Sequence, residues 1–112
     1  MTDDQIRILP RVIQDLEAIT SWIHVHSPRG ALALVLAFEA AINRLKRSPW
    51  AYSLAPESDY CGMPLRQVFF RTRKGNTYRM AILIHDQEVQ ILRIRGPGQP
   101  PLFPDELASG DT

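Results

Sequence analysis

Hydrophobic and polar residues alternate along residues 65–95 in three successive runs, each rich in Val, Ile, Phe or Tyr. Short polar breaks at residues 74–76 and 86–87 separate the runs. Breaks of this length close antiparallel hairpins, and alternation with a period of two is typical of strands. The pattern therefore predicts a three-stranded antiparallel meander, around which the rest of the chain is arranged.

The middle run divides its side chains between two faces of this sheet, because successive residues of a strand point in opposite directions. The face expected to seat helices carries Tyr78, Met80, Ile82 and Ile84. The opposite face carries Arg79, Ala81, Leu83 and His85. The last run has no single alternation, since Val89 and Ile91 oppose Leu92 and Ile94. Either this strand is buried on both faces or a β-bulge reverses its alternation, which leaves Arg93 and Arg95 without an assigned face.

The first 48 residues predict an edge strand followed by two helices. Residues 5–9 form the short strand, and Pro10 ends it while suiting the first turn of a helix. Ser27 and Pro28 provide an N-cap and a first-turn proline for a second helix, which Ser48 and Pro49 end. Apolar residues recur at helical spacing on both helices: Val12, Leu16, Ile19 and Ile23, then Ala31, Leu34 or Val35, Phe38, Ile42 and Leu45. The expected fold class is α+β, with an N-terminal helical hairpin packed on one face of a small, mainly antiparallel β-sheet.

The remaining segments are rich in proline and glycine. Residues 50–64 have neither helical nor strand periodicity and are expected to be a connecting loop. Residues 96–112 begin Gly-Pro-Gly-Gln-Pro-Pro and are expected to be a loosely docked or disordered tail. We therefore expect one domain over residues 1–95 and a C-terminal tail over residues 96–112.

Composition narrows the classes of protein that this chain can be. With 112 residues, 45% hydrophobic and 22% charged, it is typical of one globular domain. A formal net charge of +1 excludes strong attraction of the whole chain to nucleic acid or membranes, although the predicted strands are basic. Cys61 is alone, which excludes an intrachain disulfide and a multi-cysteine metal site and fits a reducing compartment. We expect a cytoplasmic protein with no membrane partner and no cofactor. We also expect no metal site, because His24 and His26 point in different directions on a helix.

Several segments together resemble the RelE/ParE superfamily of bacterial toxins, the plasmid stabilisation toxins. They are DLEAITSWI, SPRGA, LKRSPW, PLRQV, TYRMAIL and VQILRIR, in this order between Gln5 and Arg95. The resemblance implies the helical hairpin and sheet described above, and a hetero-oligomer with a cognate antitoxin. It also implies one of two activities, because ParE-like members inhibit DNA gyrase whereas RelE-like members cut messenger RNA on the ribosome.

The residues that RNA cleavage requires are present only in part. Attack of a ribose 2′-hydroxyl on the adjacent phosphate needs a base for the hydroxyl proton, cations for the developing charge and an acid for the leaving oxygen. By resemblance, Arg66 and Arg79 are the candidate cations and Glu57 is a weak candidate base, and all three would have to converge on the open sheet face. RelE-like nucleases typically place His or Tyr just beyond the last strand, where this chain has Arg95-Gly96-Pro97-Gly98, and Ile82 replaces a common tyrosine.

These departures favour the ParE-like branch: a toxin that binds and inhibits gyrase and is not an enzyme. The alternatives are a RelE-like, ribosome-dependent endoribonuclease and a non-toxic binding member of the family. The candidate partner-binding residues are Trp22, Val25, Arg66, Arg71, Arg73, Arg79, Arg93 and Arg95. Arginines on a sheet are also commonly solvated or paired locally, the reading we favour for Arg71 and Arg73. We expect an acidic antitoxin segment to add a strand or a helix to this surface.

Overall fold

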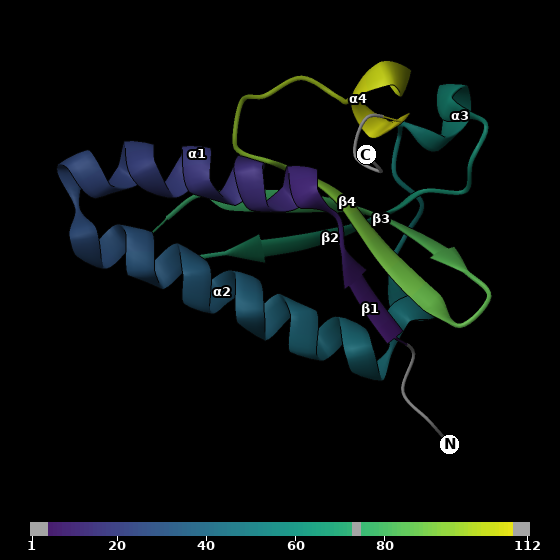
Figure 1. Ribbon diagram of the computed structural model, residues 1–112, viewed down its shortest axis with the longest axis horizontal. Helices are drawn as coiled ribbons and strands as arrows, with labels where there is room; N and C mark the ends of the chain where they lie inside the picture. Colours follow the sequence, from purple (N-terminus) through teal and green to yellow (C-terminus); the bar gives the residue numbers. More distant parts are fainter. Residues whose placement is uncertain (1–4, 73–74, 109–112) are drawn as a thin grey trace.

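The computed structural model describes residues 5–72 and 75–108, which build a four-stranded sheet in the order β1-β4-β3-β2 (Figure 1). The strands β2 (Arg66–Arg71), β3 (Thr77–His85) and β4 (Glu88–Arg95) form the predicted antiparallel meander. The predicted edge strand is β1 (Gln5–Ile8), which pairs in parallel with β4. Asp86 closes the tight turn between β3 and β4 with a positive φ of 55°, a conformation that aspartate tolerates.

The helical hairpin consists of α1 (Pro10–His26) and α2 (Pro28–Arg47), and each helix begins with a proline as predicted. Ser27 lies between the two helices, where its backbone N–H caps α1 and its side-chain oxygen accepts a hydrogen bond from the N–H of Gly30 at 2.9 Å. One serine thus serves both helix ends, so the helices reverse direction without a linker.

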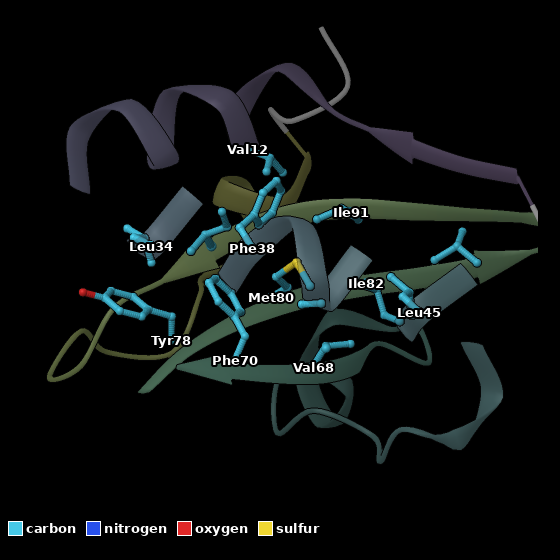
Figure 2. Close-up of a cluster of buried hydrophobic side chains, with 13 residues drawn as sticks. Val12, Leu34, Phe38, Leu45, Val68, Phe70, Tyr78, Met80, Ile82 and Ile91 are labelled. Carbon is cyan, nitrogen blue, oxygen red and sulfur yellow. The ribbon is translucent and has the colours of Figure 1, made fainter. Parts of the chain in front are cut away.

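The hairpin covers one face of the sheet, which we call the helix face. Figure 2 shows the apolar side chains that fill the space between hairpin and sheet, among them Phe38 of α2 and Phe70 of β2 with ring centroids 6.0 Å apart. The predicted stripes are confirmed. Buried residues of this core are Val12, Leu34, Phe38, Ala41, Leu45, Val68, Phe70, Tyr78, Met80, Ile82, Val89, Ile91 and Ile94, and Leu16, Ile19, Ile23, Ile42 and Ile84 pack against them.

The irregular alternation of the last strand comes from a β-bulge. Ala81 pairs with Arg93 but the next residue, Ile82, pairs with Ile91, so Leu92 is an extra residue in β4. The bulge turns Ile91 and Ile94 toward the helix face and leaves Leu92 in a second apolar cluster, beside Ala81. β4 also lies inside the sheet, between β1 and β3, and Val89 and residues 91–94 are buried.

The opposite face, which we call the second face, is covered as well. The segment predicted to be a plain loop contains a 3-10 turn, η1 (Pro49–Ala51), and a one-turn helix, α3 (Ser58–Cys61). After β4 the chain returns as α4 (Pro104–Ala108), which Figure 1 shows near α3. Side chains from these segments bury a smaller cluster composed of Leu9, Ala55, Leu65, Ala81, Leu92, Leu102 and Leu107.

Two expectations about this face are wrong. The face is not open, and the chain after β4 is not loose, because Leu102 is fully buried and Leu107 is 4% exposed. These two leucines pack into the apolar cluster of the second face, and this burial fixes the segment on the sheet although its other residues are rich in Pro and Gly. Residues 109–112 lie outside the described part of the chain. No helix in the described residues has the length and apolar character needed to cross a membrane.

Candidate functional site

The second face holds a buried ion pair between two of the candidate catalytic residues, Glu57 and Arg79. Glu57 is fully buried just before α3, and its two carboxylate oxygens accept hydrogen bonds from the Arg79 guanidinium at 2.9 and 2.5 Å. One of these oxygens also accepts a hydrogen bond from the backbone N–H of Leu102 at 3.0 Å. The pair therefore ties the segment before β2, the middle strand and the returning chain together.

This environment fixes the charge of Glu57. Burial alone would raise the pKa of its carboxyl group, because an ion is poorly solvated inside a protein. The hydrogen bonds from Arg79 and Leu102 and the positive charge of Arg79 outweigh burial, so the pKa of Glu57 lies below its ordinary value of 4.5. Glu57 is thus an ionised carboxylate at neutral pH, with both oxygens occupied by donors.

Two more arginines of the second face are held by carboxylates from other segments. Arg93 is 5% exposed and donates two hydrogen bonds, at 2.8 and 2.9 Å, to Asp15 of α1. These bonds raise the pKa of Arg93. Arg95 lies directly across from Arg79 in the sheet and donates to Glu106 of α4 at 2.6 Å. Arg79, Arg93 and Arg95, expected to bind a partner, each have a carboxylate inside the fold.

Arg66 lies on the other side of the sheet from Arg79. It pairs across the strands with Ile82, a residue of the helix-face core, whereas Arg79 pairs with Phe69 on the second face. The Arg66 guanidinium lies over the ring of Trp50, 5.0 Å from its centroid, and donates to the carbonyl of Tyr52 at 2.6 Å. The expected convergence of Arg66, Arg79 and Glu57 is therefore wrong: the structure brings only Arg79 and Glu57 together.

The exposed members of the expected partner surface lie elsewhere. Trp22 and Val25, near the end of α1, are 70% and 80% exposed. Trp22 also borders a groove of about 510 Å³ between α1 and the ends of the sheet, where Tyr78 and Pro97 form the opposite wall. Arg71 is exposed at the end of β2, and Arg73 lies outside the described residues.

Other chemistry is poorly supported in the described part of the chain. No group of three or more His, Cys, Asp or Glu residues there is arranged to hold a metal ion. Burial and the nearby charge of Glu57 raise the pKa of the Cys61 thiol, which makes it a weaker nucleophile. His85 is exposed at a turn, 3.5 Å from the carboxylate of Asp86.

Sequence reasoning missed Asp15, Leu102 and Glu106. Asp15 falls off the apolar stripe of its helix, which predicts a solvated residue, yet it accepts hydrogen bonds from Arg93 and from the backbone N–H of Ile94. For Leu102 and Glu106, the sequence offered only the local composition of the C-terminal segment as a sign that they are packed on the fold. Leu102, Glu106 and Leu107 interrupt a proline-rich segment with two apolar residues and an acid, a composition that a purely solvated tail does not need.

Comparison with known proteins identifies the family of the chain. The family model described as the ParE toxin of a type II toxin-antitoxin system, parDE, matches residues 6–99. Among solved structures, the chain is similar to one from the toxin-antitoxin complex RelBE2 of Mycobacterium tuberculosis. The two are 27% identical, with a TM-score of 0.45, over 85% of this chain and 99% of the other. None of the curated proteins matches. Since the family model spans most of its length, the chain belongs to the ParE toxin family of type II toxin-antitoxin systems.

Proposed function

We propose that this toxin acts by binding and inhibiting DNA gyrase, that it does not cut RNA, and that a cognate antitoxin neutralises it. The family supports the antitoxin partner. The observation that carries the choice of activity is the buried pair of Glu57 and Arg79. A carboxylate with both oxygens occupied by donors and no exposed surface is poorly suited to take a proton from a ribose hydroxyl.

The rest of the chain supports the same choice. No His or Tyr follows β4 in the sequence, so the usual source of a general acid in RelE-like nucleases is missing. Arg66, the second candidate cation, lies on the opposite side of the sheet from Arg79. In addition, residues 53–65 and 102–107 contribute side chains to the cluster that covers the face where RNA would have to lie.

Two assays on the purified toxin separate the activities. The first measures supercoiling of relaxed plasmid by purified gyrase, and the second measures cleavage of a message on programmed ribosomes. We expect loss of supercoiling and an intact message. Toxin mixed beforehand with its antitoxin is the control and should leave supercoiling unchanged.

Cleavage of the message with normal supercoiling would overturn the proposal. In that case Glu57→Gln and Arg79→Gln identify the source of the activity. Both variants should abolish cleavage if this buried pair is catalytic, and their thermal midpoints show whether they remain folded.

We further propose that the antitoxin binds the exposed surface formed by Trp22 and Val25, with Arg71 attracting its acidic residues. The groove beside Trp22 offers an apolar seat for a partner side chain, and the exposed Arg71 accelerates the encounter with an acidic chain. Arg79, Arg93 and Arg95 contribute less, because each already has a carboxylate partner.

Binding kinetics test this surface. Trp22→Ala should chiefly speed dissociation of the antitoxin, whereas Arg71→Glu should slow association and weaken its salt dependence. Arg47→Glu, at the far end of α2, is the matched charge control and should change neither rate. Unchanged association and dissociation rates in both test variants would mean that the antitoxin binds another surface.

A further inference from the structure

The C-terminal end of α2 carries an uncompensated positive charge. Residues 40–56 contain Arg44, Lys46 and Arg47 but no Asp or Glu. All three side chains are exposed, and within the described residues none of them takes part in an ion pair. Residues 40–56 and the nearby Arg66 together hold four of the 13 basic residues and none of the 12 acidic ones. Glu39, earlier on α2, lines a neighbouring hollow with Lys46, but these two described residues form no ion pair with each other.

The three cations share one side of the molecule. Arg44, Lys46 and Arg47 line a shallow hollow of about 670 Å³ together with Asn43, whose amide adds hydrogen-bonding groups. Cations in the last turn of a helix are also favoured by the helix dipole, which accounts for their presence in this turn. The dipole does not account for the neighbouring aromatic residue.

That aromatic residue is Trp50, which follows the end of α2 in η1 and is 62% exposed. A single exposed aromatic ring is common on a protein surface and indicates a binding site only where other contacts also fix its position. Arg66 does hold it, because its guanidinium lies 5.0 Å from the ring centroid and is fixed by the hydrogen bond to the Tyr52 carbonyl. The ring is thus a positioned, accessible platform beside a cationic hollow.

We propose that Arg44, Lys46, Arg47 and Trp50 form a binding surface for single-stranded nucleic acid. The three cations contact backbone phosphates, and an unpaired base stacks on Trp50. A positive groove with an exposed aromatic ring is the combination that single strands require, since bases in a duplex are already stacked. This binding is a property of the toxin itself and does not depend on gyrase being the target.

Fluorescence anisotropy with labelled oligothymidylate, oligouridylate and a DNA duplex tests the proposal. The single strands should bind, with a slope of log affinity against log salt of roughly −2, as three phosphate contacts predict. Trp50→Ala should weaken binding roughly five- to hundredfold, the loss expected from one stacked base. Arg44→Glu combined with Arg47→Glu should abolish the salt-dependent binding.

The matched control is Arg29→Glu, which makes the same charge change on an exposed residue roughly 27 Å away, at the other end of α2. It should leave affinity within about twofold, because screening limits the reach of surface charges to roughly 10 Å. The chain has two tryptophans, so Trp22→Phe leaves Trp50 as the sole fluorophore, and bound oligothymidylate should quench it.

Three outcomes would overturn the proposal. One is binding to the duplex that equals or exceeds binding to single strands. A second is equal binding of polyglutamate, which would assign the surface to an acidic protein. The third is an equal loss of affinity in Arg29→Glu and in the Arg44 and Arg47 double variant. That result would mean that the net charge of the protein attracts the nucleic acid without a defined binding site. Thermal midpoints within a few degrees of the unmodified chain exclude unfolding as the cause.

Discussion

The two faces of the sheet are covered in different ways. On the helix face, side chains of α1, α2 and all the strands interdigitate as one apolar core. On the second face a smaller apolar cluster lies among arginines of β3 and β4, and each of these arginines is paired with a carboxylate from another segment of the chain. The helix face thus gains its stability from buried area, and the second face depends more on directional pairing.

This difference explains why three of the arginines expected to bind a partner are paired inside the fold. Arg79, Arg93 and Arg95 have the composition of an anion-binding site, yet Glu57, Asp15 and Glu106 occupy the place of an anion. A set of basic residues on a sheet therefore indicates a binding site only if no carboxylate of the same chain reaches it first. Among the cations of the described residues that form no ion pair with a carboxylate, Arg44, Lys46 and Arg47 lie together at the end of α2.

The largest effect should come from the helix face. Phe38→Ala removes a ring that is 5% exposed and packs edge to face on Phe70, which should lower the free energy of unfolding by about 3–5 kcal/mol. Denaturant titration measures it. Leu36→Ala on the same helix is the control, because Leu36 is 55% exposed and its loss should cost less than about 0.5 kcal/mol.

The buried pair of the second face should respond differently to single and double changes. Glu57→Met alone leaves the Arg79 guanidinium largely buried without its partner and should cost about 3 kcal/mol. Replacing both residues with Met should restore most of that loss, because a buried ion pair contributes little more than apolar side chains of similar volume. A double variant as unstable as the single one would contradict this expectation. It would mean that the loss comes from another contact of Glu57, such as the hydrogen bond that it accepts from the backbone N–H of Leu102.

A smaller effect should come from the apolar cluster of the second face. Leu102→Ala should cost about 2 kcal/mol, near the lower limit for a buried leucine, because the thin cover over this cluster can collapse into the space. Phe103→Ala is the neighbouring control, since Phe103 is 63% exposed. Equal stability of Leu102→Ala and the unmodified chain would show that the segment does not hold this face closed.

The smallest effect should be the pH dependence of stability. The pKa values of Glu57 and Glu106 are lowered in the folded chain from the ordinary 4.5, so the unfolded chain takes up protons first as the pH falls. The stabilisation is complete above about pH 4.5 and declines as the pH falls toward the folded pKa values. Urea titrations between pH 7 and pH 3 should show this decline, and Glu57→Gln should reduce it.

The sequence alone determined the helix face. Apolar residues at helical and strand spacing, Pro10 and Pro28 at helix starts, Ser27 between the helices and the short breaks of the meander are local signals, and each was predicted correctly. The motifs also indicated the family that the match to residues 6–99 shows. Periodicity carries this information because hydrophobic burial is non-directional and requires only that apolar side chains share a face.

Only the tertiary structure decided the second face. Asp15 meets Arg93 across 78 positions of the chain, Leu102 meets Glu57 across 45, and Arg79 meets Glu57 across 22. No local pattern encodes such pairs, because a hydrogen-bonded ion pair depends on the direction and distance of two particular side chains. The bulge at Leu92 is another example: the sequence showed that the alternation of β4 breaks, and only the pairing of Ala81 with Arg93 located the extra residue. Whether an arginine is free to bind a partner therefore depends on the folded chain, because folding can bring a carboxylate of the same chain within hydrogen-bonding distance.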